Sequence, residues 1–293
     1  MALGIRRRLV PPLRAFADVF KNPNLRRLML AWNAFFIGDW AYMVAIAIYA
    51  YRVGGPLAVG IVEIAQTFPA AIAAPFAALL SDRYPRHRVY LVANMLRALA
   101  LLLLAAAVLA QVPTLVVYPL AAVNAMIATT FWPAQTALLP ELARSPEELT
   151  AANAASSTIE GLGGMIGSAL GGIIAAVAGV GIVFVMAAAV FLLAAFFASR
   201  IRMAPTTGRE ARAERSPGAF HELLEGFRAI RGEAGVPLLV LLVSAEWLLR
   251  GALTVLIVAT ALFLLHLWQS GVGFLNSSFG VWSLVWALGS LAL

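Results

Sequence analysis

The chain has 293 residues, of which 62% are hydrophobic and 12% charged, whereas soluble domains carry about 25% charged residues, so its composition excludes a soluble globular protein. The net charge of +7 does not indicate nucleic-acid binding, because the basic residues flank apolar runs, where membrane topology and anionic lipids explain them. The absence of cysteine excludes disulfides and thiolate metal sites, and the three histidines are scattered, so we expect neither a metal nor another cofactor.

Long apolar runs predict membrane-spanning helices, because about 20 mostly apolar residues are needed to cross the hydrocarbon core. A basic segment, residues 1–27, comes first and lacks the apolar core and cleavage site of a signal peptide. Eight spans follow, at residues 28–51, 57–80, 89–110, 114–139, 151–178, 181–199, 236–265 and 271–293. We therefore expect an all-α integral membrane protein with a six-helix unit at 28–199, a linker at 200–235 and two further helices at 236–293.

Lys and Arg are distributed unevenly between the two sides of this arrangement. Eighteen of them fall on one side, in the segment 1–27, the loop 81–88, the loop 140–150 and the linker 200–235. In the loops of the other side only Arg52 is basic. Because short loops rich in Lys and Arg remain in the cytoplasm, the N-terminus is predicted to be cytoplasmic, with anionic lipids as partners of that face.

The linker contains one further predicted helix, which starts at Ser216-Pro217. Its apolar residues form a single stripe: Phe220, Leu223, Leu224, Phe227 and Ile230. Such a pattern predicts an amphipathic helix lying on the inner membrane surface, either as a plain connector or as a regulatory element. The sequence ends at Leu293 within an apolar run, so we expect a fragment of a longer protein, or a truncated or split gene.

Six charged or polar residues fall at a comparable depth within five of the spans: Asp39, Arg97, Asn124, Glu160, Glu246 and Arg250. An ionisable group at the centre of a bilayer costs on the order of 3 kcal/mol or more, so such residues usually face a polar interior. We therefore expect them to line a shared cavity for a small-molecule substrate and protons. Aromatic residues near this depth suit either stacking on bulky substrates or simple packing: Trp32, Phe35, Phe36, Trp40, Tyr42, Phe131, Trp132 and Trp247.

Several of the polar residues also have simpler interpretations. Glu246 and Arg250 are four residues apart, so they can neutralise each other on one helix face. Arg97 can extend its side chain toward the cytoplasmic face, or it can pair with Asp39, which has no basic neighbour in its own span. Glu160 has no nearby cation in the sequence and is the candidate protonatable carboxylate, because burial favours the neutral acid.

A charged loop between two spans, residues 81–88, reads SDRYPRHR. It resembles the loop motif of the major facilitator superfamily, G-x-x-x-D-R-x-G-R-R, through Asp82, Arg83, Arg86 and Arg88. Ala78 and Pro85 stand in place of the two glycines. The resemblance implies that the four charged residues act as a cytoplasmic gate, through ion pairs and helix-end contacts; alternatively, Arg86 and Arg88 only fix topology.

The span 151–178 carries glycines four residues apart, which leave a smooth face for close contact with another helix. It resembles the antiporter motif of the same superfamily, G-x-x-x-G-P-x-x-G-G, through Gly163, Gly167, Gly171 and Gly172. Ser168 replaces the usual proline. Ahead of this span, Ser145 is predicted to cap the helix, with Pro146 in its first turn.

Further segments extend the resemblance over essentially the whole chain, at residues 22–27, 133–142 and 152–153. The combination resembles the branch that contains the enterobactin exporters and related bacterial drug-efflux proteins. It implies a major facilitator fold in the bacterial inner membrane, with a complete six-helix N-terminal half and the first two helices of the C-terminal half. The arginine that many proton antiporters carry in the fourth span has no counterpart, and Asn124 lies in that helix instead.

The function that this resemblance implies is export of small amphipathic or hydrophobic molecules, of the drug or siderophore type, by alternating access in antiport with protons. A full-length protein of this kind is expected to be a monomer. An alternative from another class is a non-transporting membrane scaffold or a truncated transporter fragment. An enzyme is not expected, because the sequence contains no HExxH, no GxSxG, no acidic metal cluster and no phosphate loop.

Overall fold

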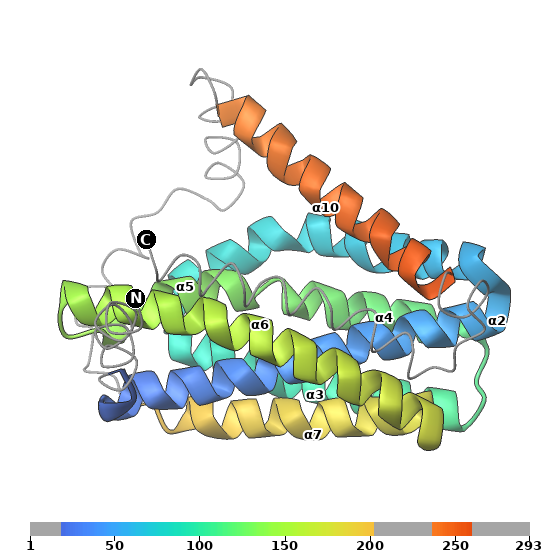
Figure 1. Ribbon diagram of the computed structural model, residues 1–293, viewed down its shortest axis with the longest axis horizontal. Coiled ribbons are helices and arrows are strands. Elements are labelled where there is room, and N and C mark those ends of the chain that lie inside the picture. Colours follow the sequence, from blue (N-terminus) through green and yellow to red (C-terminus); the bar gives the residue numbers. More distant parts are fainter. Residues whose placement is uncertain (1–18, 202–235, 260–293) are drawn as a thin grey trace, which may run out of the picture.

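The computed structural model describes residues 19–201 and 236–259, and within these ranges all regular secondary structure is α-helical (Figure 1). The helices are α2 (Pro23–Arg83), α3 (Arg86–Leu109), α4 (Thr114–Ala128), α5 (Phe131–Leu142), α6 (Pro146–Val177), α7 (Val180–Ser199) and α10 (Val236–Ala259). Six helical stretches in this part of the chain are long and apolar enough to cross a membrane. The all-helical prediction is confirmed, whereas the amphipathic helix and the span 271–293 lie outside the described residues.

Helix α2 consists of two arms rather than one straight rod. At Gly54 and Gly55 the backbone leaves helical geometry, and Gly55 has a φ of 65°, which residues with a side chain rarely adopt. We call residues 23–53 the first arm and residues 56–83 the second arm; the chain folds back between them at the right-hand end of Figure 1. The arms correspond to the predicted spans 28–51 and 57–80.

The predicted span 114–139 matches one long apolar stretch, Thr114–Leu142, but this stretch consists of two helices. Helix α4 ends at Ala128, and α5 begins at Phe131. Pro133 explains the break. A proline has no N–H to donate to the Thr129 carbonyl, and its ring clashes with that carbonyl. The Thr129 and Thr130 hydroxyls donate to the carbonyls three residues before them, at 2.7 and 2.8 Å, so both hydroxyls are satisfied within the turn.

Several helix ends meet at one end of the bundle. The Asn22 side chain caps α2 and donates from Nδ2 to the Leu142 carbonyl and to Glu148 Oε1, both at 3.0 Å. Arg27 Nη1 donates to the Arg200 carbonyl at 2.7 Å. These bonds join the starts of α2 and α6 to the ends of α5 and α7. We call this the basic end, because Arg26, Arg27, Arg83, Arg86, Arg88 and Arg200 lie in the helix termini and the turn that meet there.

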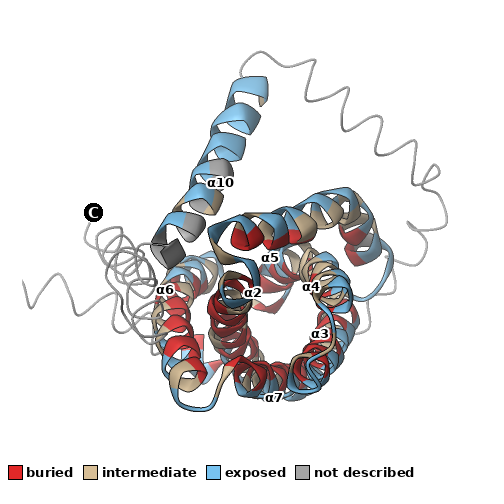
Figure 2. Cartoon of the chain, turned by 90° about the vertical axis from the view of Figure 1, so that its right-hand side faces the viewer, coloured by how far each residue is buried: buried red, intermediate tan, exposed pale blue. Residues whose placement is uncertain are grey.

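The first arm of α2 is the central element of the packing. Helix α2 packs against α4, α6 and α7, while α3 packs against α4 and α7. Viewed from the end opposite the basic end, the buried residues of these helices face the interior (Figure 2). Among the described elements, helix α10 has substantial contacts with α2 alone. It is exposed on most sides and carries large apolar side chains such as Leu239 and Leu241 on its surface.

Candidate functional site

A buried ion pair lies between α2 and α3. Arg97 Nη2 is 2.5 Å from Asp39 Oδ1, and Arg97 Nε donates to Asn124 Oδ1 of α4 at 3.2 Å. The Arg97 side chain is 2% exposed, and Asn124 is fully buried. The structure therefore contains the contact expected between Asp39 and Arg97, and the alternative in which Arg97 extends to the membrane surface is wrong.

The Arg97 guanidinium also lies against two aromatic rings. Its central carbon is 4.2 Å from the centre of the Phe191 ring and 5.0 Å from that of Phe35. Aromatic faces attract cations, and this attraction is stronger where water is excluded. One carboxylate, one amide oxygen and two rings from α2, α4 and α7 thus hold this cation of α3, so its position depends on the packing of four helices.

A second polar contact connects the two arms of α2. The Tyr42 hydroxyl donates to Gln66 Oε1 at 2.5 Å, and Gln66 Nε2 donates to the Val62 carbonyl at 3.3 Å. Tyr42 lies one turn after Asp39 on the same arm, and its hydroxyl lies beside the Asn124 amide. Gln66 was missed in the sequence, although a glutamine within the apolar span 57–80 is a usable signal, and Tyr42 was named only as an aromatic residue near the polar level.

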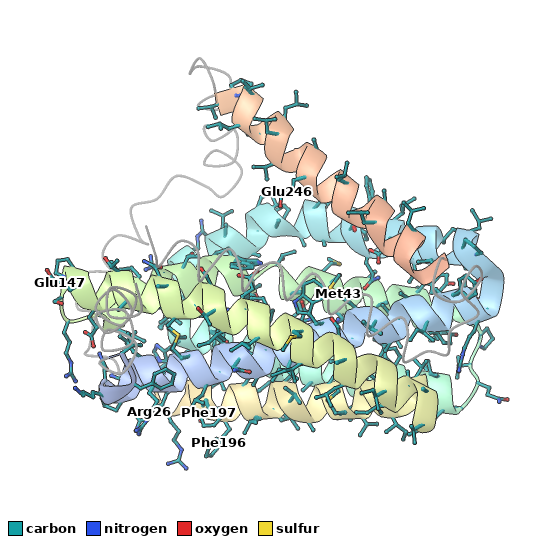
Figure 3. All side chains as sticks on the ribbon, in the orientation of Figure 1. Arg26, Met43, Glu147, Phe196, Phe197 and Glu246 are labelled. Atoms are coloured by element: carbon teal, nitrogen blue, oxygen red, sulfur yellow. The ribbon has the colours of Figure 1, made fainter. Side chains whose placement is uncertain are left out.

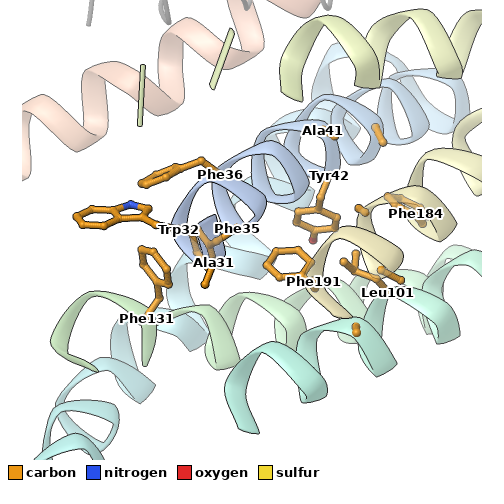
Figure 4. Close-up of a cluster of buried hydrophobic side chains, with 14 of the residues drawn as sticks. Ala31, Trp32, Phe35, Phe36, Ala41, Tyr42, Leu101, Phe131, Phe184 and Phe191 are labelled. Atoms are coloured by element: carbon orange, nitrogen blue, oxygen red, sulfur yellow. The ribbon is translucent and has the colours of Figure 1, made fainter. Parts of the chain in front are cut away.

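Most of the aromatic residues that suited either substrate stacking or packing are core residues. Trp32, Phe35, Phe36 and Phe131 are between 2% and 5% exposed and pack ring against ring, as Figure 4 shows. Of this cluster only Trp132, beside Phe131 on α5, reaches the surface, with 44% of its area exposed. The structure therefore favours the packing interpretation for the four buried rings.

The remaining predicted cavity residues lie on other helices. Glu160 is half-buried on α6, and Glu246 projects from the middle of α10, where it is exposed (Figure 3). Both carboxylates take part in polar or electrostatic interactions. The side chain of Arg250 falls outside the described set, so its pairing with Glu246 remains a prediction. Of the six predicted cavity residues, the structure brings Asp39, Arg97 and Asn124 into contact with one another through Arg97.

The charged loop makes one clear contact with another element. Arg86 Nη1 forms an ion pair with Glu141 Oε1 at 2.9 Å and donates to the Ala137 carbonyl at 2.8 Å. This contact fastens the start of α3 to the end of α5, so Arg86 does more than set topology. Arg83 and Arg88 are exposed, and the Asp82 side chain is outside the described set. The gating role of the four residues remains a prediction.

The glycines of α6 lie against the first arm of α2. A Cβ atom added at Gly163 would lie 2.6 Å from the Phe36 Cβ, and one added at Gly171 would lie 2.9 Å from the Ala41 backbone. At Gly167 it would overlap the Ile37 carbonyl oxygen. Gly172 is buried as well. Helix α6 starts as predicted, since Ser145 Oγ accepts from the Glu148 N–H at 3.2 Å.

An open groove lies away from the ion pair, between the second arm of α2 and α4. It has a volume of about 390 Å³ and an apolar lining: Ala65, Pro69, Leu115, Tyr118, Pro119 and Ala122. None of the six predicted cavity residues lines this groove. Across residues 19–201 and 236–259, no cluster of His, Asp and Glu side chains is arranged to hold a metal ion.

Comparison with known proteins identifies the family. A family model described as Major Facilitator Superfamily matches residues 28–293. The chain is also 28% identical over 181 residues to a Bacillus subtilis (strain 168) protein named "Uncharacterized MFS-type transporter YfiS". That alignment covers 60% of this chain and 42% of the length of the relative. No solved structure matches. Because the family model covers most of the chain and the described part is helical throughout, this multi-pass membrane protein belongs to the Major Facilitator Superfamily of transporters.

Proposed function

We propose that the protein exports small amphipathic or hydrophobic molecules by alternating access, in antiport with protons. The observation that carries this proposal is the Asp39–Arg97 ion pair, buried among four helices of a transporter-family bundle. A carboxylate whose counter-charge is a buried arginine can exist in two states, ionised and paired or protonated and released. Each state favours a different arrangement of the helices that hold the pair, which is what coupling requires.

The coupling can be written as linked equilibria. Protonation of Asp39 removes the charge that Arg97 neutralises, so the guanidinium must find another acceptor or its helices must shift. A substrate that binds better when Asp39 is ionised lowers its proton affinity, and a proton lowers the affinity for that substrate by the same factor. Such mutual exclusion is the thermodynamic condition for antiport. Glu160, Glu246 and Arg250 complete the proposed cavity.

The orientation follows from the distribution of charge. With the basic end in the cytoplasm, eighteen Lys and Arg residues face that compartment, and the protein sits in a bacterial inner membrane. Arg83 and Arg88, which are exposed, are proposed to contact anionic lipid headgroups, while Asp82 and the Arg86–Glu141 pair form part of a cytoplasmic gate. Residues 28–199 then form the first half of the transporter, joined by 200–235 to a second half that starts at 236.

The test compares carboxylate variants of the full-length protein in proteoliposomes. A pH gradient drives transport of lipophilic dyes, ethidium and rhodamine 6G, and the rate is measured for Asp39→Asn and Glu160→Gln. We expect Asp39→Asn to abolish the response to the gradient and Glu160→Gln to weaken it. Glu147→Gln serves as control, because Glu147 is exposed at the start of α6 (Figure 3). Gradient-driven transport at the wild-type rate in both test variants would refute the assignment.

A further inference from the structure

We propose that buried polar side chains along the seam between α3 and α5 hold a chain of ordered water, which carries the proton between Asp39 and the basic end. This inference rests on the proposed proton antiport, and it assigns the route that the proton takes. We use the name seam for Arg86, Tyr90, Asn94 and Arg97 on α3 and Gln135 on α5. Arg86 and Tyr90 contact α5, and Arg97 ends the row where α3 faces α2, α4 and α7. None of the three uncharged residues was singled out in the sequence.

The four residues of α3 form one stripe. Their spacing of four, four and three residues places them on one helix face, and at about 1.5 Å per residue the stripe is roughly 16 Å long. Tyr90 is fully buried, and Asn94 and Arg97 are each 2% exposed. The stripe ends in an ion pair at both extremes, Arg86 with Glu141 at the basic end and Arg97 with Asp39 deeper in the bundle. It therefore connects the proposed proton site with one face of the protein.

Helix α5 supplies the opposite wall of the seam. The Phe131 ring lies 5.7 Å from the Tyr90 ring, and the Ala137 carbonyl accepts from Arg86. Gln135 lies between these two contacts along α5, one turn after Phe131, and it is fully buried. Its amide is therefore held at a level between Tyr90 and Arg86, within the stretch that a proton would have to cross.

Each of the seam residues has at least one buried polar atom without a hydrogen-bond partner, although Arg86, Asn94 and Arg97 form hydrogen bonds through other atoms. Eleven buried side-chain nitrogen and oxygen atoms in the described part of the chain have no hydrogen-bond partner, and six of them belong to the seam: Arg86 Nε, Tyr90 Oη, Asn94 Oδ1, Arg97 Nη1, Gln135 Nε2 and Gln135 Oε1. Buried polar atoms without partners are costly, and proteins usually satisfy them with internal water that makes two to four hydrogen bonds. Donors and acceptors gathered in one seam match that requirement.

The chemistry of the seam suits proton transfer. Amide and phenol groups donate and accept hydrogen bonds without carrying a charge that would trap the proton. The arginines at the two ends are each neutralised by a carboxylate, so neither presents an unbalanced positive charge while Asp39 is ionised. Titratable groups on the helices packed around the seam include Tyr42, Tyr49, Tyr51 and Glu63 on α2, His87 and Arg88 on α3, Tyr118 on α4, and Glu147, Glu148 and Glu160 on α6.

The proton step balances without any other reactant. A proton from the far side binds an Asp39 carboxylate oxygen, which releases Arg97. The O–H bond at Asp39 then breaks as a water beside Asn94 takes the proton, and each water along Tyr90 and Gln135 passes one on. Water near the Arg86–Glu141 pair receives the last proton, and the Asp39 carboxylate pairs with Arg97 again. No electrons are exchanged.

One experiment separates proton transfer from substrate movement. In proteoliposomes with full-length protein, dye-for-dye exchange at equal pH needs no proton, whereas pH-driven transport does. We expect Asn94→Leu combined with Gln135→Leu to slow pH-driven transport at least tenfold and to leave exchange within twofold of wild type. Ser168→Ala, which removes another buried hydroxyl without a partner, should change neither. Equal losses in both assays, or no loss in either, would overturn the route. If the unmutated protein itself exchanges dye but shows no pH-driven transport, the proposed antiport is overturned instead.

A second measurement does not depend on transport. The chain has no cysteine, so single cysteines can be probed with silver ions, which are close to water in size. We expect Asn94→Cys and Gln135→Cys to react from the basic end at least 100 times faster than Leu101→Cys, a fully buried apolar site on α3. Three equally unreactive thiols would show that the seam is dry and would overturn the proposal.

Discussion

The two partners of the Asp39–Arg97 ion pair differ in exposure, which makes the cost of removing each of them different. The Arg97 side chain is 2% exposed, and that of Asp39 is 26% exposed. Replacing Asp39 by Asn keeps an acceptor but leaves the guanidinium buried without a counter-charge. Replacing Arg97 by Met removes the buried cation and leaves a carboxylate that water can reach. We therefore expect Asp39→Asn to lower the free energy of unfolding more than Arg97→Met does.

The structure sets the size of each effect. Breaking a buried ion pair from one side costs about 3–5 kcal/mol, chiefly because the other charge stays buried. For Asp39→Asn we expect about 3 kcal/mol, because the amide and the rings of Phe35 and Phe191 still face the cation. For Arg97→Met we expect about 1–2 kcal/mol, since Met refills the aromatic site. The double variant holds no charge and should lie within about 1 kcal/mol of wild type.

The free energies can be measured by unfolding in mixed micelles of increasing SDS fraction, followed by tryptophan fluorescence. The double-mutant cycle then yields a coupling of about 3–5 kcal/mol between Asp39 and Arg97. Glu147→Gln, on an exposed side chain, should change stability by no more than about 0.5 kcal/mol. If the two single effects add in the double variant to within about 0.5 kcal/mol, the two charges do not stabilise each other and the reasoning fails.

Further variants test the packing around the pair in the same unfolding assay. Gly167→Ala should cost about 2 kcal/mol or more, because its Cβ would overlap the Ile37 carbonyl, whereas Gly60→Ala meets open space and should be neutral or slightly stabilising; equal effects would exclude close packing as the cause. Asn22→Ala should cost about 1–3 kcal/mol by removing a helix cap and two bonds between helix ends, and an unchanged midpoint would show that these bonds contribute nothing. Gly55→Ala should cost about 1 kcal/mol or more, since its φ of 65° is strained for alanine, and a neutral result would exclude strain at this turn.

Apolar length was enough to predict most helices, because an element that crosses a membrane needs a long run without charges. The interruption at Thr129 and Thr130 was not predicted, because these threonines and the alanine before them can occur within a continuous apolar span. The residue that indicates the interruption is Pro133, because a proline removes the hydrogen bond to the carbonyl four residues before it. A proline is not sufficient by itself, since Pro69, Pro75 and Pro119 lie inside helices that continue through them.

The ion pair was predictable and the Tyr42–Gln66 bond was not, for a physical reason. Unpaired charges at equal depth in apolar spans need partners, so the sequence alone predicts that Asp39 and Arg97 pair with each other. A tyrosine and a glutamine carry no charge and can be satisfied locally, so the sequence does not say which partner they choose. The contacts of Asn22 were hidden for another reason, since its acceptors lie 120 and 126 residues away in the chain.

The bonds at the basic end and the glycine contacts have a joint consequence for movement. Asn22 joins the starts of α2 and α6 to the end of α5, Arg27 joins α2 to the end of α7, and Gly167 presses α6 against the first arm of α2. Sliding any of these helices along its neighbour would break several bonds at once and create backbone overlap. The proposed alternating access is therefore expected to keep the ends of α2, α5, α6 and α7 together at the basic end, so that the helix shifts around the ion pair occur deeper in the bundle. Among the described helices, α10 packs chiefly against α2. A spin-label distance between the ends of α2 and α6 at the basic end should stay constant while a distance from α7 to α10 changes with pH; the reverse pattern would mean that the bundle itself opens.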